Sequence, residues 1–175
     1  MAAIKLFSIA LVLVFFAGSV FADKPQELFF KVFPIGKVKK AGDKTYIELA
    51  GEYIPGLAGL DEFSHVTVVY WFDKNDTPEK RSKLLTSRVS HGEPVGVFAT
   101  HSPVRPNLIA VSHCRILSVE DNRVYINEID AFDGSPVLDL KCFIPYTYDR
   151  KDEVFTLPEW ARKVVAKRVK SGGKK

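Results

Sequence analysis

The sequence has few of the residues that build metal centres or disulfide frameworks. It contains two cysteines, Cys114 and Cys142, and four scattered histidines, so no group has the spacing of a zinc site. No glycine-rich phosphate loop precedes a helix, and no serine has the strand–turn–helix setting of an exposed nucleophile. These absences disfavour metalloenzymes and hydrolases. No metal site is expected, and no catalytic residue is assigned.

The two cysteines allow a single pairing. In an oxidising compartment they would bridge if the strands that carry them are neighbours. Each also lies among apolar residues, as an ordinary buried thiol does. Their spacing along the chain does not decide between a disulfide and two free thiols.

Long apolar runs are absent except at the N-terminus. The run Leu6–Phe16 follows Lys5 and precedes Val20-Phe21-Ala22, which suits a cleavage site. This is the pattern of a secretory signal peptide, and the run is shorter than the roughly 20 residues that a membrane-spanning helix needs. We expect residues 1–22 to be a signal peptide and the protein to be exported, periplasmic or secreted, with no stable membrane span in the mature chain. The alternative is an uncleaved anchor, which still leaves the domain facing outward.

Acidic residues are absent from the C-terminal end, where Trp160 to Lys175 carries seven basic residues. The whole chain has a net charge of +4, so without Lys5 and that tail the body from Asp23 to Glu159 has a net charge of −4. A basic tail can hold nucleic acid or anionic lipid, although a solvated end is the commoner role. A second basic cluster, Lys80–Lys83 with Arg88, is a further hint of an anionic partner.

Strand patterns dominate the chain after the N-terminal segment. Seven segments combine β-branched and aromatic residues with turn signals between them: 28–38, 45–49, 65–72, 95–100, 109–119, 123–129 and 137–144. The run HVTVVYWF from His65 predicts a central strand, and the polar excursion from Asp73 to Gly92 is typical of a functional or mobile loop. Pro158 suits the first position of a helix that runs to about Lys170. The expected fold is all-β, mainly a small antiparallel β-barrel or sandwich over residues 23–157, with a basic C-terminal α-helix and tail over 158–175.

Polar residues concentrate in two stretches. The first is GVFATHSPVRPN, from Gly96 to Asn107, which two prolines stiffen; it is either a solvated turn or the preorganised rim of a pocket. The second is DAFDGSPVLDLK, from Asp130 to Lys141, in which carboxylates could cap the backbone of a turn. Arg105, held between Val104 and a proline, suits bidentate capture of a carboxylate or phosphate. An internal ion pair with Asp130, Asp133 or Asp139 would serve equally well and needs no ligand.

Three blocks of sequence follow one another along the chain: GLDEFSHVTVVYWF, GVFATHSPVRPNLIAVS and IDAFDGSPVLDLKCFIPY. In this combination the chain resembles the TsaA-like (TrmO-type) family over roughly Phe33 to Tyr146. Members of that family are β-barrel, S-adenosylmethionine-dependent methyltransferases that N6-methylate the threonylcarbamoyl-modified adenosine beside the tRNA anticodon. The resemblance implies a small antiparallel barrel, S-adenosylmethionine as cofactor, tRNA as partner, and a homodimer with the cofactor site near the subunit interface.

The resemblance also assigns individual positions. The implied cofactor-binding residues are Asp73, Lys74, His101, Val111, Asn127, Glu128, Ile129 and Asp130. The implied signature residues, which shape the pocket or contact substrate, are Thr100, Ser102, Arg105, Asn107, Asp133, Pro136, Asp139 and Lys141. The chain departs from the family at Asp73, where a histidine is usual, and at His101, where an arginine is usual. Both changes make the pocket more negative.

Two hypotheses on function follow. In the first, the protein is a methyltransferase of the family's type, which works mainly by positioning the methyl donor and the acceptor amine. In the second, it is an exported, non-catalytic ligand-binding barrel, because neither S-adenosylmethionine nor tRNA is expected outside the cytoplasm and fold does not fix function. An exported enzyme that acts on another nucleophile is a third and weaker hypothesis.

Overall fold

A computed structural model describes residues 30–87, 94–144, 159, 162–163 and 166. Contacts divide the chain into Met1–Lys31 and Val32–Lys175, and the second unit holds the barrel described below. The expected signal peptide over 1–22 and most of the expected C-terminal helix lie outside the described residues. Within that helix, the four described residues, Glu159, Arg162, Lys163 and Ala166, are helical. No helix among the described residues has the length and apolar character to cross a membrane.

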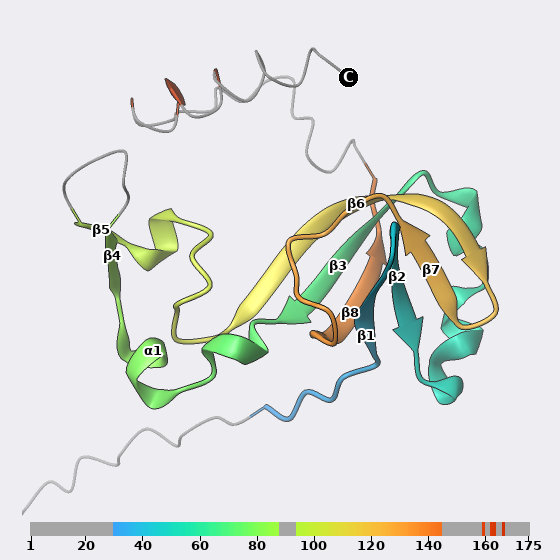
Figure 1. Cartoon of the computed structure of the whole chain (residues 1–175), viewed down its shortest axis with the longest axis horizontal. Coiled ribbons are helices and arrows are strands. Elements are labelled where there is room, and N and C mark those ends of the chain that lie inside the picture. Colours follow the sequence, from blue (N-terminus) through green and yellow to red (C-terminus); the bar gives the residue numbers. More distant parts are fainter. Residues whose placement is uncertain (1–29, 88–93, 145–158, 160–161, 164–165, 167–175) are drawn as a thin grey trace, which may run out of the picture. The chain divides into compact units, whose positions relative to one another are not determined.

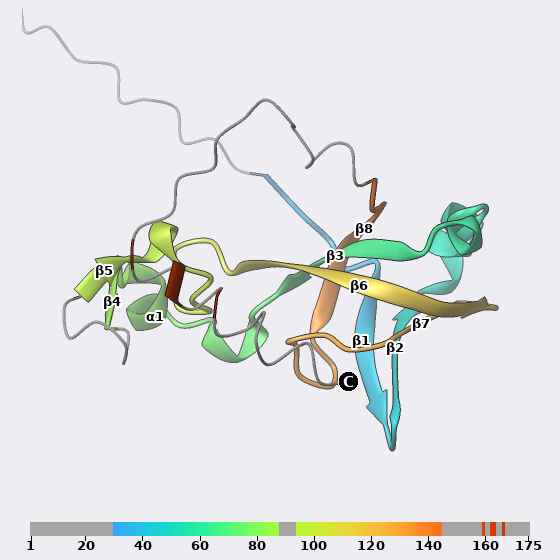
Figure 2. The same ribbon diagram turned by 90° about the horizontal axis from the view of Figure 1, so that it is seen from above.

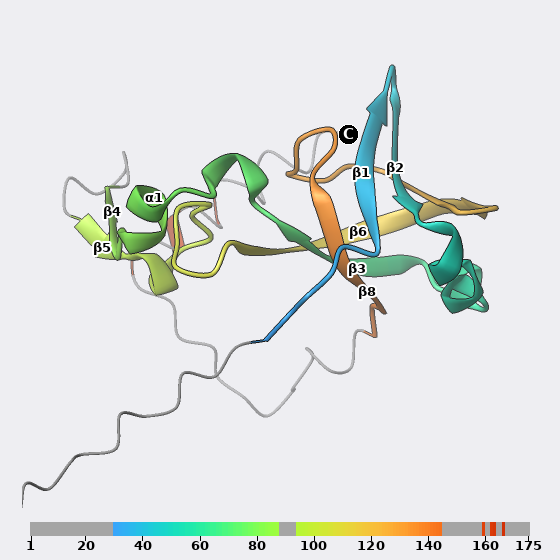
Figure 3. The ribbon, with the colours of Figure 1, turned by 90° about the horizontal axis from the view of Figure 1, so that it is seen from below.

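The described residues form a closed antiparallel barrel, as expected from the strand patterns (Figure 1). Around the barrel the strands follow the order β1, β2, β7, β6, β3, β8. Their bounds are β1 (Gly36–Ala41), β2 (Lys44–Leu49), β7 (Arg123–Ile126), β6 (Ile109–Glu120), β3 (His65–Trp71) and β8 (Pro136–Cys142). The run from His65 is indeed central, because β3 pairs with β6 on one side and β8 on the other. Figures 2 and 3 show β3 and β6 running side by side along much of their length.

The barrel interior is filled by alternate residues of its strands. Val66, Val68 and Tyr70 of β3 are almost fully buried, and Val38, Ile47, Val124, Ile126 and Val137 meet them from the other strands. This alternation arises because successive side chains of a strand point to opposite faces. The β-branched residues that predicted strands are therefore the same residues that form the core.

Two tight connections and one narrow seam close the barrel. β1 turns into β2 through Gly42-Asp43, where Gly42 has a φ of 61°, a conformation that glycine adopts without strain. β6 turns into β7 at Asp121-Asn122, so the expected strand segments 109–119 and 123–129 form a hairpin. The seam between β1 and β8 has two register pairs, Gly36 with Val137 and Lys37 with Pro136. At Gly36 an added Cβ would lie 2.3 Å from the Glu48 carbonyl oxygen, so only glycine fits this close approach.

The chain between β2 and β3 forms two 3-10 helices, η1 and η2, next to β8. η1 (Gly51–Leu57) and η2 (Leu60–Glu62) connect β2 to β3 in a glycine-rich stretch that contains Pro55. A second, smaller pocket of about 440 Å³ lies here, and Leu57, Phe63 and Asp139 are among its lining residues.

The chain between β3 and β6 makes an excursion outside the barrel wall (Figure 1). It contains η3 (Asp73–Asn75), α1 (Pro78–Ser82), β4 (Leu85–Ser87), β5 (Pro94–Gly96) and η4 (Val97–Ala99). β4 and β5 pair only with each other. The expected strand over 95–100 is therefore wrong beyond Gly96. The chain turns there because the Thr100 N–H and hydroxyl both donate to the Val97 carbonyl oxygen, at 3.1 and 2.9 Å.

The two cysteines lie on strands that are not neighbours. Cys114 of β6 and Cys142 of β8 both stand opposite Val66 of β3, one on each side. Two strand spacings separate their Cα atoms by about 9.5 Å, whereas a disulfide needs Cα atoms within about 7 Å. Both thiols are free, Cys114 buried and Cys142 exposed. Burial, and to a smaller extent the charge of Glu128, raise the pKa of the Cys114 thiol to about 11.

Candidate functional site

The larger pocket lies where β3 ends, β6 begins and the loop after η4 returns to the barrel. Its volume is about 1040 Å³. The lining comes from the end of β3, the loop 98–107, the start of β6 and the link before β8: Tyr70, Phe72, Phe98, Ala99, Thr100, His101, Arg105, Pro106, Asn107, Ile109, Ala110, Val111, Ser112 and Asp130. Aromatic rings, one guanidinium, one imidazole and one carboxylate therefore face a single space. A lining of this kind suits an amphipathic small molecule with both an aromatic part and charged groups.

Tyr70 links the barrel core to this pocket. Its hydroxyl donates to the Asp130 carbonyl oxygen and accepts from the Ser112 hydroxyl at 3.4 Å. Its ring packs edge-on against Phe72, with 5.6 Å between centroids and 73° between planes. Burial, with a smaller contribution from the Asp130 carboxylate, raises the pKa of Tyr70 above its ordinary value, against the lowering effect of the Ser112 hydrogen bond. The phenol is neutral at physiological pH and serves as a fixed donor that holds the Asp130 backbone.

Short side-chain-to-backbone bonds shape the first half of the polar loop. The buried Thr100 hydroxyl accepts from the Ser102 N–H at 3.1 Å, and the Ser102 hydroxyl accepts from the Val104 N–H at 3.3 Å. Serine and threonine compete for backbone groups in this way and so fix turns. Of the two interpretations of this loop, the pocket rim is the one that the structure supports, because His101, Arg105 and Asn107 line the cavity.

Arg105 has no ion pair within the described part of the chain. The acids that could have neutralised it are engaged elsewhere or too far away. Asp133 accepts from the Lys40 backbone N–H at 2.8 Å, and the Asp139 carboxylate lies 2.7 Å from the Lys141 ammonium. Asp130 lines the same pocket as Arg105 without pairing with it. The half-buried guanidinium is therefore available to a ligand anion.

The residues assigned from the resemblance divide into two groups. Six line the larger pocket: Thr100, His101, Arg105, Asn107, Val111 and Asp130. The others lie outside that lining: Asp73, Lys74, Ser102, Asn127, Glu128, Ile129, Asp133, Pro136, Asp139 and Lys141. Several in the second group have structural contacts instead.

The structural contacts explain the polar residues of the second group. The Asp73 carboxylate accepts from the Ser135 hydroxyl at 3.1 Å and lies 3.3 Å from the Lys74 ammonium. The Asn127 side chain accepts from the Arg115 N–H at 2.8 Å, which ends β7 at Ile126, before the expected residue 129. Ile129 belongs to the hydrophobic core. Asp73 does not line the larger pocket, so its carboxylate adds no negative charge to that lining.

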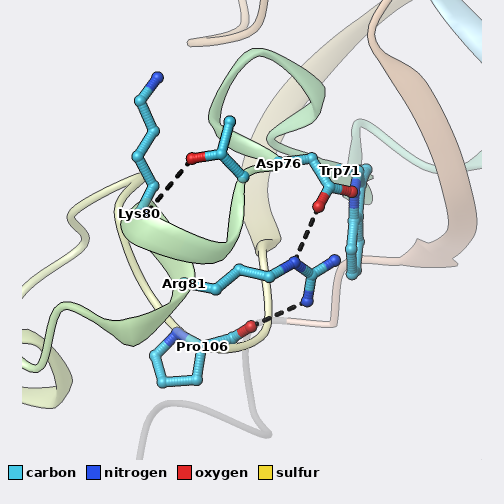
Figure 4. A network of polar contacts seen from close by, with 6 residues as sticks. Trp71, Asp76, Lys80, Arg81 and Pro106 are labelled. Atoms are coloured by element: carbon cyan, nitrogen blue, oxygen red, sulfur yellow. Dashed lines mark hydrogen bonds and ion pairs between the residues drawn. The ribbon is translucent and has the colours of Figure 1, made fainter.

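The sequence did not reveal the aromatic residues that line the pocket, or the arginine outside the loop that hydrogen-bonds to the pocket rim. Tyr70 and Phe72 looked like strand residues, and Phe98 like the interior of a strand. Arg81 was assigned to a basic cluster for an anionic partner. In the structure Arg81 donates to the Asp76 carboxylate at 2.8 Å and to the Pro106 carbonyl oxygen at 3.0 Å (Figure 4). The signal was the threonine-proline pair at 77–78, which begins a helix and so places Arg81 one turn later.

The barrel agrees with what comparison with known proteins finds. The tRNA-methyltransferase O N-terminal domain family matches residues 30–149, which is more than half of the chain. The chain belongs to this family. A probable S-adenosyl-L-methionine-binding protein of Pyrococcus horikoshii is 43% identical over 124 residues, covering 69% of this chain and 86% of that protein. A tRNA (adenine(37)-N6)-methyltransferase of Mus musculus is 42% identical over 88 residues, covering 50% of this chain and 20% of that protein.

Solved structures show the same fold for this tRNA-methyltransferase O family member. A crystal structure of TrmO from Pseudomonas aeruginosa has a TM-score of 0.59 and 26% identity, and the match covers 77% of this chain. The match spans 63% of that structure's chain, and the methyltransferases from mammals are longer still relative to the matched region. The family match over residues 30–149 contains the whole barrel.

Proposed function

We propose that this protein binds S-adenosylmethionine in the larger pocket and transfers its methyl group to the N6 amine of an adenosine in tRNA. The observation that carries the proposal is the convergence of Arg105, His101 and Asp130 on one aromatic-lined pocket in a chain that belongs to the tRNA-methyltransferase O family. Relatives named as S-adenosyl-L-methionine-binding proteins and as tRNA (adenine(37)-N6)-methyltransferases support it.

The pocket lining fits the chemical groups of this methyl donor. Arg105, without an internal partner, suits the carboxylate of the methionine part. Asp130 supplies negative charge near which a sulfonium is stabilised. Phe72 and Phe98 offer an apolar, aromatic surface that suits an adenine ring, and the buried Tyr70 supports Phe72 from behind.

The chemistry asks little of the protein beyond orientation. The lone pair of the N6 amine forms the new C–N bond as the S–CH₃ bond breaks in line, the sulfur keeps the bonding pair, and the amine then loses a proton to solvent. Placing donor and acceptor in line can supply much of the rate enhancement. The residues of the rim would hold the donor, and the open side of the pocket would admit the base.

Titration calorimetry with S-adenosylmethionine and S-adenosylhomocysteine tests the binding step. We expect micromolar affinity that falls in Arg105→Ala and in Asp130→Ala. Lys141→Gln is a matched control, because this signature cation pairs with Asp139 and lies outside the pocket lining. Absence of binding at millimolar ligand would refute the proposal. Transfer of a labelled methyl group to tRNA, with the product identified as N6-methylated adenosine, tests the acceptor.

We infer a homodimer for the working protein. Large apolar side chains are exposed at the start of β4, in η4 and at the start of β6: Leu84, Leu85, Phe98, Ile109 and Val111. The last three also line the larger pocket. Exposed apolar surface of this kind marks interaction sites in soluble proteins. Light scattering after size-exclusion chromatography should give twice the monomer mass, and Phe98→Ser with Ile109→Ser should give monomers. A monomeric wild-type protein would refute the dimer.

Export favours a second candidate function, a non-catalytic ligand-binding barrel. It rests on the signal-peptide pattern of residues 1–22. Mass spectrometry of the purified protein should find Asp23 as the first residue, in an extracytoplasmic fraction. Export together with no affinity for the methyl donor would favour this second function. A cytoplasmic chain that retains Met1 would refute export.

A further inference from the structure

Arg81 contacts the pocket rim from outside the loop that forms it. Its Nη1 donates to the Pro106 carbonyl oxygen at 3.0 Å, and its Nε donates to the Asp76 carboxylate at 2.8 Å (Figure 4). The guanidinium also lies over the Trp71 ring, 5.3 Å from the centroid. The guanidinium thus donates hydrogen bonds from its edge while its face lies over an aromatic ring, and the ammonium of a lysine cannot do both in this way.

The partners of Arg81 are themselves fixed. The second oxygen of Asp76 accepts from the Trp71 indole N–H at 3.0 Å, so the carboxylate is held on both sides. Trp71 is the last residue of β3 and is anchored by the barrel. The next residue, Phe72, donates its N–H to the Leu108 carbonyl oxygen at 2.8 Å. Arg81 therefore connects the end of β3 to the turn before β6.

The short helix α1 places Arg81 in this position. Five residues are too few for a helix that is stable alone. Thr77 caps it by accepting from the Lys80 N–H at 3.3 Å, and Pro78 begins it with its fixed φ. The Lys80 ammonium donates to the Lys74 carbonyl oxygen at 3.0 Å, which ties the helix back to η3.

The second half of the rim depends on this contact. Within the described part of the chain, Arg81 is the only residue outside the loop that hydrogen-bonds residues 103–107. Pro106 stands between Arg105 and Asn107, both of which line the pocket. Fixing the Pro106 carbonyl therefore fixes the peptide planes on which these two side chains are mounted.

We propose that Arg81, together with Asp76 and Trp71, is a positioning network that holds Arg105 and Asn107 in place at the ligand pocket. The network touches no ligand and acts through the Pro106 carbonyl. The side chain of Arg81 is 35% exposed and that of Asp76 is 44% exposed. Exposed ion pairs contribute little to the stability of the whole fold. The arrangement thus serves local order in the rim more than the stability of the barrel. The inference rests on the proposed function for the identity of the ligand, but not for the order of the loop.

Arg81→Lys in the full chain tests this role, because it keeps the charge and removes the fork. Asp76→Asn is a second variant, which leaves the backbone contact of Arg81 in place while weakening its anchor. Lys83→Gln is the matched control, since Lys83 follows the same helix and, among the residues that the structure describes, forms an ion pair only with the exposed Glu79, at 3.6 Å. Three quantities are measured for each: amide hydrogen exchange in residues 100–108, the Kd for S-adenosylhomocysteine, and Tm.

We expect Arg81→Lys to speed exchange by about tenfold at Val104, whose N–H donates to the Ser102 hydroxyl within the rim, and to raise Kd by about tenfold, the effect of losing one charge-assisted hydrogen bond. The barrel amides and the control should not change. Unchanged exchange in the loop would overturn the proposal, and so would faster exchange with unchanged Kd. If the wild-type chain binds no S-adenosylhomocysteine, the proposed function fails separately, and the exchange rates still decide whether Arg81 orders the rim.

Discussion

Arg105→Ala separates a ligand-binding role from a structural one most directly. The wild-type guanidinium is half-buried, lines the larger pocket and has no ion pair within the described residues. Removing it therefore breaks no internal contact between charged groups. A residue without such contacts should change the free energy of unfolding by no more than about 0.5 kcal/mol.

Ligand affinity should respond very differently. A hydrogen bond to a charged group contributes about 1.5–3 kcal/mol, so the loss of the Arg105–carboxylate contact should raise Kd by about 10-fold to 150-fold. Arg105→Lys should fall between wild type and alanine, because an ammonium keeps the charge without the bidentate geometry. The same pattern is expected for both S-adenosylmethionine and S-adenosylhomocysteine, since the two share the amino acid carboxylate.

Calorimetric titration and thermal unfolding on the same protein preparations give both quantities. A domain of this size loses about 4 °C in Tm for each kcal/mol of stability, so Arg105→Ala should shift Tm by about 2 °C or less. A large drop in Tm with unchanged affinity would refute the reasoning, because it would mean that Arg105 holds the fold together rather than the ligand. Reduced affinity that appears equally in Lys141→Gln would refute it too, since that cation lies outside the pocket lining.

Three further predictions concern the barrel and its titratable groups. Gly36→Ala should destabilise the barrel by about 1–3 kcal/mol in urea unfolding, the usual cost of overpacking, because the new Cβ would lie 2.3 Å from a carbonyl oxygen; Gly51→Ala, with open space around it, should be nearly neutral, and equal midpoints would contradict this. Native protein at pH 8 should react with a thiol reagent only at Cys142, and Cys114, whose pKa is raised to about 11, should react only after unfolding; one reacting thiol more or fewer would contradict the assignment. Hydrogen bonds from the Arg81 guanidinium and from the Trp71 indole lower the pKa of the Asp76 carboxyl, so its contribution to loop order should be present above the ordinary carboxyl pKa of about 3.9 and be lost as the pH falls below that value toward the lowered one. Protection factors in residues 100–108, which correct the exchange rates for the intrinsic effect of pH, should therefore be the same at pH 5 as at neutral pH, and lower factors at pH 5 would contradict this sign.

Local sequence patterns predicted the strands well because the same residues both favour extended backbone and fill the core. His65 to Trp71 is the clearest case, since its alternate residues point into the barrel. The pattern failed at residues 30–35, which precede β1 and are not in a strand although the expected segment was 28–38. It failed again at Val97 to Ala99, where three apolar residues in an extended-looking run form a 3-10 turn. Periodicity over so short a run does not distinguish a strand from a turn that a threonine closes.

The family signature likewise predicted a site, but it did not show which of the signature residues line the pocket. Arg105 and Asp139 are equally polar and equally part of the signature, yet one lines the larger pocket and the other the smaller pocket beside η1 and η2. The order of residues along the chain does not show which carboxylate pairs with which cation. That Asp133 and Asp139 are engaged by Lys40 and Lys141, leaving Arg105 without an internal partner, is a property of register and loop packing.

The amino-acid sequence by itself indicated the all-β class and the resemblance that names a methyl donor, because strand propensity and each block of the family signature depend on residues close together in the chain. The tertiary structure alone decided which side chains share a pocket, that the two cysteines stand on either side of Val66, and that Arg81 reaches Pro106. These facts join segments 25 or more residues apart in the chain. Strand register sets which residues stand opposite one another in the barrel, since a shift of one residue would turn every side chain to the other face, and loop packing sets the contact of Arg81 with Pro106.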